Sequence, residues 1–178
     1  AGVEFVRYYN SMVGSQWVAR RMGEGWRDSY QASISVYVVS ATTYAQVRPS
    51  QGASIEFRST DGGVTWLTDA DVTYRLIKLT NGWQVTRPDD AVETYDSAGK
   101  LVQTKDRAGR QRTITYDASG RMASVSDAFG RTLSFAYNAD GRIAAMTDPP
   151  GPNVSPPPLY QVGLMRSADS SAVTPPSL

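Results

Sequence analysis

Short runs of alternating apolar and polar residues make up most of the chain, and turns that contain glycine separate these runs. Residues 113–116 form one run, residues 121–126 form the next, and Asp117-Ala118-Ser119-Gly120 lies between them. A two-residue alternation rich in β-branched and aromatic side chains is typical of a strand. Asp can bond backbone amides two residues on, and Gly takes the positive φ that other residues avoid, so the segment between the runs predicts a tight turn. The pattern therefore predicts two antiparallel strands joined by a turn.

This unit recurs with a period of 21 residues between Tyr95 and Gly151. Self-similarity of fixed length indicates a repeat architecture in which each unit buries its apolar surface against the next. The sequence therefore predicts an all-β fold, an open antiparallel sheet of hairpin repeats that meanders. The columns that keep the period are Tyr95-Asp96, Tyr116-Asp117 and Tyr137-Asn138; Gly99, Gly120 and Gly141; Asp106, Asp127 and Asp148; and Gly109, Gly130 and Gly151.

Apolar columns indicate which repeat positions are buried. Met122 and Val125 belong to two such columns and lie three residues apart in one predicted strand. An ideal pleat would place them on opposite faces. Either a β-bulge or a strand that contributes to both faces would explain this spacing. The two columns are Leu101, Met122 and Ile143, and Thr104, Val125 and Met146.

The Tyr-Asp column has two interpretations. It could form a ladder on which sugars or bases stack, or each Tyr could be a buried aromatic beside a carboxylate that caps a turn. The second is favoured, because the Asp recurs where the turn geometry needs it. Burial of the three Tyr side chains would count against a binding ladder. The arginines that follow the turn glycines are expected to be solvated or to reach across strands: Arg110, Arg121, Arg131 and Arg142.

The repeated unit resembles the YD repeats of the Rhs family, which teneurins and the shells of insecticidal toxin complexes share. The resemblance rests on Tyr-Asp-Ala-Ser-Gly-Arg at residues 116–121, on its two register mates, and on Asp-Ala-Phe-Gly-Arg-Thr at residues 127–132. In that family the repeats form a sheet that spirals into a hollow shell around a C-terminal toxin or other cargo. Asp148-Pro149 is similar to the Asp-Pro motif of the family's self-cleaving core, but the flanking core motif is missing. No catalysis is therefore assigned to it.

Residues 1–90 are predicted to be a β segment without the repeat. Strands are expected at residues 3–9, 32–47, 54–59, 72–79 and 83–86, a loop at residues 12–21, and turns at residues 49–52, 61–63 and 81–82. The segment resembles the part of Rhs proteins that precedes the first YD repeats. The scattered matches, in order, are Phe5, Arg7, Tyr9, Asn10, Ser11, Gly23, Gly25, Trp26, Ser29, Tyr30, Arg48, Pro49, Gly52, Phe57, Gly82, Trp83 and residues 93–96.

The character of the chain changes after Gly151. Eight of the ten prolines lie from Pro149 onward, and Pro cannot donate to a sheet ladder, so the tail is not a further repeat. Residues 159–165 are its one apolar stretch, which either covers an exposed sheet edge or has no fixed place. The predicted organisation is a non-periodic β segment at residues 1–90, repeats at residues 91–151 and an irregular tail at residues 152–178.

Composition excludes several chemistries. The chain of 178 residues has no Cys and no His, which excludes disulfides, thiolate nucleophiles, His-based triads and the usual zinc, copper or haem ligation. It has 18 basic and 17 acidic residues, a balance that does not indicate nucleic-acid binding. No apolar run reaches the length of a membrane span. We expect no cofactor, no metal and no membrane-spanning segment.

Two pairs of carboxylates and four tryptophans are the remaining candidates for a site. Asp69/Asp71 and Asp89/Asp90 lack a third ligand or a regular loop spacing, so turn and loop roles are favoured over a Ca²⁺ or acid–base site. The tryptophans could line a carbohydrate site. We expect instead that two of them are core and that one, after a Gly-Gly turn, is partly exposed. The core pair is Trp26 and Trp83, the exposed one is Trp66, and Trp17 is the fourth.

Three functions follow as hypotheses. The first is a non-catalytic structural or encapsulating part of a toxin-associated Rhs protein, from bacteria, secreted or delivered by a secretion system, as the resemblance implies. The second is a secreted or surface module that binds sugar or protein through exposed aromatics. The third, an enzyme that relies on carboxylates, would need two of the four Asp residues named above to converge, and we expect no enzyme. An open sheet also leaves unpaired edges, so self-association or pairing with the remainder of an Rhs shell is expected.

Overall fold

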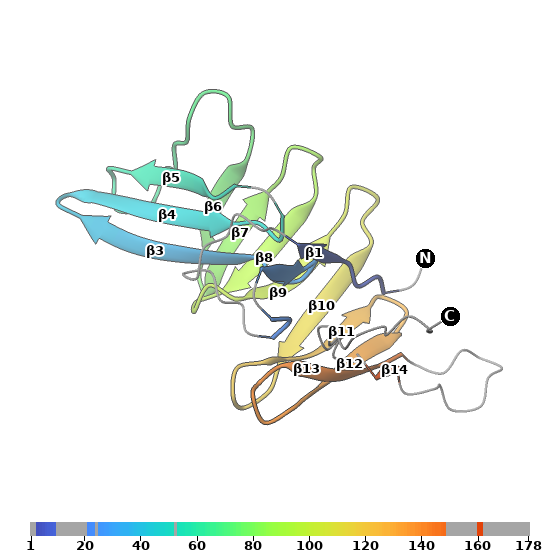
Figure 1. The fold of residues 1–178 in the computed structure, drawn as a ribbon. Coiled ribbons are helices and arrows are strands. Elements are labelled where there is room, and N and C mark those ends of the chain that lie inside the picture. The colour runs from blue at the N-terminus through green and yellow to red at the C-terminus, as the bar shows by residue number, and fades with distance from the viewer. Residues whose placement is uncertain (1–2, 10–20, 24, 52, 149–159, 162–178) are drawn as a thin grey trace, which may run out of the picture.

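The computed structural model describes residues 3–9, 21–23, 25–51, 53–148 and 160–161, and these ranges contain strands and no helix. No helix that could cross a membrane is therefore found among them. The predicted all-β fold with open antiparallel sheets is confirmed (Figure 1). The predicted loop at residues 12–21 lies almost wholly outside the described residues, as does most of the proline-rich tail.

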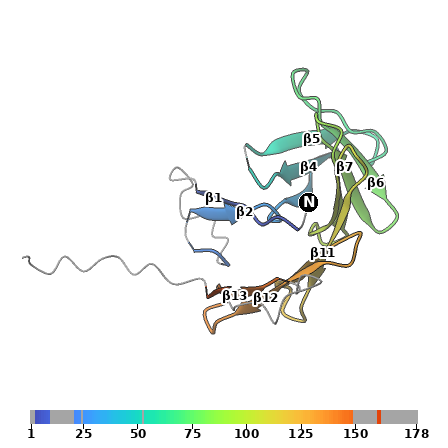
Figure 2. The same ribbon diagram turned by 90° about the vertical axis from the view of Figure 1, so that its right-hand side faces the viewer.

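One large sheet meanders through the repeats. Its strands lie side by side in sequence order, and each pair is antiparallel. Figure 2 shows that the sheet curves like a letter C. The nine strands are β6 (Arg75–Leu79), β7 (Gly82–Thr86), β8 (Val92–Asp96), β9 (Leu101–Lys105), β10 (Gln111–Tyr116), β11 (Met122–Asp127), β12 (Thr132–Tyr137), β13 (Ile143–Thr147) and β14 (Tyr160–Gln161). The predicted boundary at residues 90 and 91 falls between β7 and β8.

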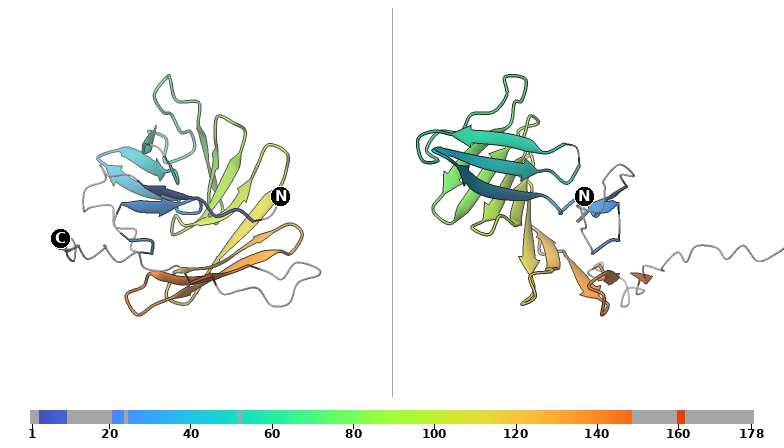
Figure 3. Two further views of the ribbon diagram at one scale, coloured as in Figure 1. Left: turned by 45° about the vertical axis from the view of Figure 1, so that its right-hand side comes forward. Right: turned by 60° about the vertical axis from the view of Figure 1, so that its left-hand side comes forward.

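The strands before β6 form two smaller sheets. β1 (Arg7–Tyr9) pairs with β2 (Trp26–Asp28), and β3 (Ser33–Val39), β4 (Thr42–Arg48) and β5 (Ile55–Ser59) form a three-stranded sheet. Figures 2 and 3 show the β1–β2 pair inside the curve of the large sheet and the β3–β5 sheet over one end of it. The predicted strand at 3–9 is shorter than expected, and the single run predicted at 32–47 is a hairpin.

A β-bulge recurs in the repeats and explains why the two apolar columns lie three residues apart. The register shifts by one residue just before each repeat tyrosine, in the β8–β9, β10–β11 and β12–β13 pairs. In the middle pair Tyr116 faces Met122 while Thr115 faces Ser124, so Ala123 has no partner. The extra residue turns Met122 to the same face as Val125, and the two are at most 1% exposed. Of the two explanations for this spacing, the bulge is confirmed.

One apolar core joins the β3–β5 sheet to the large sheet. It contains Ile34, Val47 and Phe57 from the small sheet and Tyr95 and Met122 from the large one. Phe5, ahead of β1, packs on Phe135 of β12 with ring centroids 5.3 Å apart. Since the concave face of a curved sheet cannot bury itself, the N-terminal residues supply the apolar surface that covers it.

The loop after β5 has its own polar network. The Asp61 carboxylate accepts hydrogen bonds from the Ser59 hydroxyl at 2.6 Å and the Thr65 backbone N–H at 2.9 Å, and these hold the pKa of Asp61 well below its usual range. Trp66 donates its indole N–H to the Gly63 carbonyl at 3.1 Å. The predicted turn at residues 61–63 is therefore correct, and its Asp is fully used in building it.

Candidate functional site on the concave face and repeat turns

Five successive turns of the large sheet share one hydrogen-bond pattern. The N–H of the first residue donates to the carbonyl of the fifth, and the N–H of the fourth, a Gly, donates to the carbonyl of the first. The side-chain oxygen of the first residue accepts the N–H of the fifth at 2.8–3.1 Å. The glycines have φ between +73° and +82°, as the sequence predicts. These turns span residues 96–100, 106–110, 117–121, 127–131 and 138–142.

Arginines at the fifth position close three of these turns. Arg110, Arg121 and Arg131 each donate from Nε to the Asp that begins the turn, at 2.7–2.8 Å. The Arg121 backbone N–H and guanidinium together hold the pKa of Asp117 below its ordinary value. The turn carboxylates are thus occupied by their own turn, as the favoured interpretation of the Tyr-Asp column predicts.

The repeat tyrosines join each unit to the one before it. Tyr116 donates its hydroxyl to the Leu101 carbonyl, and Tyr137 donates to the Met122 carbonyl, both at 2.7 Å. The accepting residues lie beside the bulges, where the regular ladder is interrupted. Burial raises the pKa of Tyr116 to about 12. Arg121 lies 4.7 Å from the Tyr137 ring centroid, so its guanidinium also contacts the following unit.

The first tyrosine of the series has a different partner. Tyr95 is 1% exposed and donates its hydroxyl in a short hydrogen bond to Glu93, which is 6% exposed. Burial raises the pKa of Glu93, and burial together with the Glu93 charge raises that of Tyr95. Arg87 Nη1 lies 3.7 Å from the other Glu93 oxygen. No repeat precedes Tyr95, so a buried carboxylate replaces the carbonyl that the later tyrosines use.

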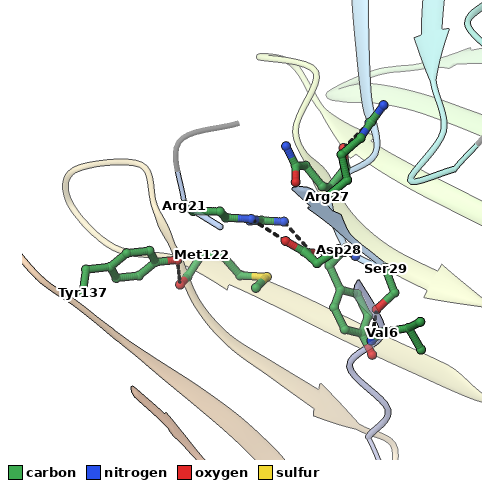
Figure 4. A network of polar contacts seen from close by, with 9 residues as sticks. Val6, Arg21, Arg27, Asp28, Ser29, Met122 and Tyr137 are labelled. Carbon is green, nitrogen blue, oxygen red and sulfur yellow. Dashed lines mark hydrogen bonds and ion pairs between the residues drawn. The ribbon is translucent and has the colours of Figure 1, made fainter. Parts of the chain in front are cut away.

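A buried ion pair fixes the N-terminal segment to the last repeat (Figure 4). Arg21 donates from Nε and Nη2 to both oxygens of Asp28, each at 2.7 Å, and Asp28 is fully buried. Asp28 also accepts the Tyr30 N–H at 2.9 Å. The Arg21 carbonyl accepts the N–H of Ile143 in β13 at 2.8 Å. One arginine thus joins β2 to a strand more than a hundred residues away in sequence.

A second junction attaches β3 to a repeat turn. The Ile34 N–H donates to the Gly99 carbonyl at 3.0 Å, and Ser33 forms an isolated bridge with Lys100. A Cβ placed on Gly99 would lie 1.9 Å from the Ile34 carbonyl oxygen. Gly99 is therefore required both for its positive φ and for the close approach of β3.

A scan of protein-family models matches the RHS Repeat family twice, at residues 95–132 and at residues 116–151. Residues 95–151 are RHS repeats. The two matches begin 21 residues apart, at Tyr95 and Tyr116, which is the period of the turns and bulges described above. A search of curated proteins finds no match to the chain. The resemblance of residues 3–94 to the segment before the first YD repeats stays a prediction.

The RHS tyrosines do not form an open ladder. Tyr95 is buried, Tyr116 and Tyr137 are half-buried, and their hydroxyl groups are all engaged in hydrogen bonds within the chain. The accompanying Asp96, Asp117 and Asn138 cap turns. A stacked ligand would have to displace contacts that hold adjacent repeats together.

A polar cavity of about 320 Å³ lies between the N-terminal segment and the first RHS repeats. Of the four Asp candidates, Asp89 alone lines it, and its carboxylate bonds Arg87 and the Ala91 N–H. Asp69 and Asp71 are exposed, and Asp90 ion-pairs weakly, at 3.8 Å, with Arg75. Within the described ranges no three acidic residues gather as metal ligands.

The tryptophans differ in part from expectation. Trp66 and Trp83 pack against the core in an edge-to-face pair with centroids 5.6 Å apart. Trp26 was expected in the core, and this is wrong: it is 36% exposed and packs against the Tyr9 ring, with the Arg7 guanidinium 5.4 Å from its centroid. Trp26 shares a strand face with Asp28, but it lies opposite Tyr9 at the end of the β1–β2 ladder, and its ring packs on Tyr9 and not on the core. Trp17 lies outside the described residues.

Sequence reasoning missed the groups that connect distant segments. Arg21 and Asp28 lie in a segment without periodicity, and nothing in their spacing distinguishes them from surface charges. Glu93 had a weak signal, because it lies two residues before the first repeat tyrosine and hence on the same face of its strand. The face shared with a buried Tyr indicates a buried carboxylate that needs a partner.

Proposed function

We propose that this chain is a non-catalytic structural segment of an Rhs shell, at the point where the RHS repeats begin. The observation that carries the proposal is the covered concave face. The N-terminal segment inside the curve and the β3–β5 sheet over one end of it pack on the large sheet through a shared apolar core, so the same chain covers this concave face. A toxin-associated, secreted or delivered protein is the context that the family implies.

The repeat chemistry supports a structural role. Turn carboxylates bond their own backbone, tyrosine hydroxyl groups bond the preceding repeat, and the buried acid Glu93 bonds Tyr95. The carboxylates are thus occupied in forming turns and in bonding Tyr95, and the hydroxyl groups of Tyr116 and Tyr137 join each unit to the one before it. Such nearest-neighbour interfaces are how repeat arrays obtain their stability.

Limited proteolysis of the assembly isolated from its natural source tests the encapsulating role. A shell protects its enclosed protein, and Gly99→Ala, which breaks the junction between β3 and the first repeat, should make that protein digest faster than in the wild type. Gly141→Ala is the matched control, since a Cβ there meets nothing within 4 Å. Equal digestion in the wild type and in Gly99→Ala would contradict encapsulation by this segment.

One observation favours a binding module as the second candidate. Tyr9, Trp26 and Arg7 form an exposed aromatic cluster with a cation on the outer part of the β1–β2 pair. Aromatic faces of this kind stack on sugars. A glycan array with wild type and Trp26→Ala would show a glycan signal lost in the variant if the cluster binds sugar, and no wild-type signal would reject this candidate.

A further inference from the structure

The free edge of β3 differs from the sheet edges at β5 and β6. Val36, Tyr37, Val38 and Val39 are between 39% and 65% exposed, and the strand Ser33–Val39 contains no charged residue. Natural sheets protect exposed edges with charges, prolines, bulges or a covering segment. β3 has no charged residue and no proline. It also has no bulge, because its register with β4 is unbroken over all seven residues.

The backbone of β3 is also available for pairing. Val39 and Thr42 flank the two-residue loop of the β3–β4 hairpin, so Val39 and Tyr37 form backbone hydrogen bonds with β4. Val38 and Val36 alternate with them and direct their N–H and C=O groups away from β4. Ile34 fits this alternation, since its N–H reaches outward to Gly99. Beyond Ile34, no hydrogen bond joins the outward groups of β3 to another described part of the chain.

Two-fold symmetry distinguishes β3 from the edges at β5 and β6. In an isologous pair each strand meets its own copy, so a charge near the two-fold axis lies close to the same charge of the copy. β6 carries Arg75 and Lys78, so pairing it with its own copy would bring positive charges close together on both faces. β5 is partly covered by Leu67, which exchanges two backbone hydrogen bonds with Arg58. β3 alone among these three edges is uncharged and uncovered.

We propose that a second copy of this chain pairs with β3 in antiparallel orientation, through the outward groups of Val36 and Val38. The two small sheets then form one continuous six-stranded sheet, β5-β4-β3 followed by the same strands of the second copy in reverse order. The apolar side chains at the hairpin end bury one another across the two-fold axis. This inference goes beyond the proposed function, since it does not require a cargo.

Light scattering on the purified full chain over a dilution series, with wild type and two proline variants, tests the proposal. Val38→Pro removes an outward N–H while leaving the β3–β4 ladder intact, so we expect a folded monomer or a dimer at least about tenfold weaker. Lys78→Pro is the matched control on β6: Leu79 pairs with Gly82 beside a two-residue loop, so Lys78 also directs its N–H outward. The control should dimerise like the wild type.

Three results would overturn the proposal. They are a monomeric wild type at every concentration, a folded Val38→Pro variant that dimerises normally, and a Lys78→Pro variant that loses the dimer while Val38→Pro keeps it. Circular dichroism shows whether each variant is folded. If Val38→Pro unfolds, Val38→Lys decides the question, because it changes only an exposed side chain and places two cations across the proposed axis.

Discussion

Glu93 is a buried acid whose position follows from the start of the repeat series. Later tyrosines find a carbonyl of the preceding unit, but Tyr95 has no preceding unit and bonds Glu93 instead. A buried carboxylate is costly when charged, and burial accordingly raises its pKa. Terminal units of repeat arrays commonly differ from internal ones, and here the difference is a single polar pair.

Glu93 should make stability depend on pH. Its folded-state pKa lies above the ordinary value of 4.5, so its contribution is fully present below pH 4.5 and is lost as pH rises through the folded pKa. Glu93→Gln cannot ionise but can still accept the Tyr95 hydroxyl. We expect urea unfolding to show that the free energy of unfolding of the variant rises relative to that of the wild type as pH rises from 4 to 8.

The control for this prediction is Glu56→Gln. Glu56 also accepts a tyrosine hydroxyl, that of Tyr37, at 3.0 Å, but the pair is exposed to solvent. We expect the free energy of unfolding of Glu56→Gln, plotted against pH, to run nearly parallel to that of the wild type. Parallel curves for Glu93→Gln as well would contradict a buried carboxylate with a raised pKa.

At the scale of the element, the turns are largely readable from sequence and the hairpin of the small sheet is not. An Asp followed three residues later by Gly and then by Arg determines the turn by its own hydrogen bonds. The β3–β4 loop has Ser40 at φ 54°, where Gly is the usual residue, so the run at residues 32–47 contains no turn signal. The bulge was foreseen as one of two alternatives, since the spacing of Met122 and Val125 required some departure from the pleat.

Two glycines with the same conformation should respond differently to substitution. Gly99 and Gly141 have φ of +78° and +74° and hold the same place in their turns. Gly141→Ala should cost about 1 kcal/mol of unfolding free energy, from backbone strain alone. Gly99→Ala should cost roughly 3 kcal/mol or more, because its Cβ would collide with the Ile34 carbonyl and break the junction with β3.

Denaturant unfolding at one temperature measures both variants. The difference between them isolates the close approach of β3, since the strain of the turn is common to both. Equal losses of unfolding free energy in Gly99→Ala and Gly141→Ala would mean that the β3–Gly99 junction contributes nothing to stability. Sequence predicted the positive φ at both positions, but the close contact depends on β3, which arrives from more than sixty residues away.

At the scale of the whole molecule, the β3–β5 sheet and the large sheet are expected to unfold together. Their apolar side chains form one cluster that includes residues of β3, β4, β5 and the repeats. The repeat period could show which repeat residues face the core but not what covers them, because the covering residues come from a segment without periodicity. That missing information is long-range: it depends on Arg21, Asp28 and Phe5 meeting strands near the other end of the chain.

Asp28→Asn should therefore loosen β13, although the two are far apart in sequence. The variant leaves Arg21 without its buried partner, and breaking a buried ion pair costs roughly 3–5 kcal/mol. Since the Arg21 carbonyl accepts the Ile143 N–H, hydrogen exchange at Ile143 should accelerate. Asp106→Asn is the matched control: it weakens an ion pair of the same 2.7 Å length with Arg110, but in an exposed turn. Unchanged hydrogen exchange at Ile143 in Asp28→Asn would show that the N-terminal segment does not hold the last repeat. Faster exchange in that variant but not in the control would show that one buried carboxylate couples the N-terminal segment to the last repeat.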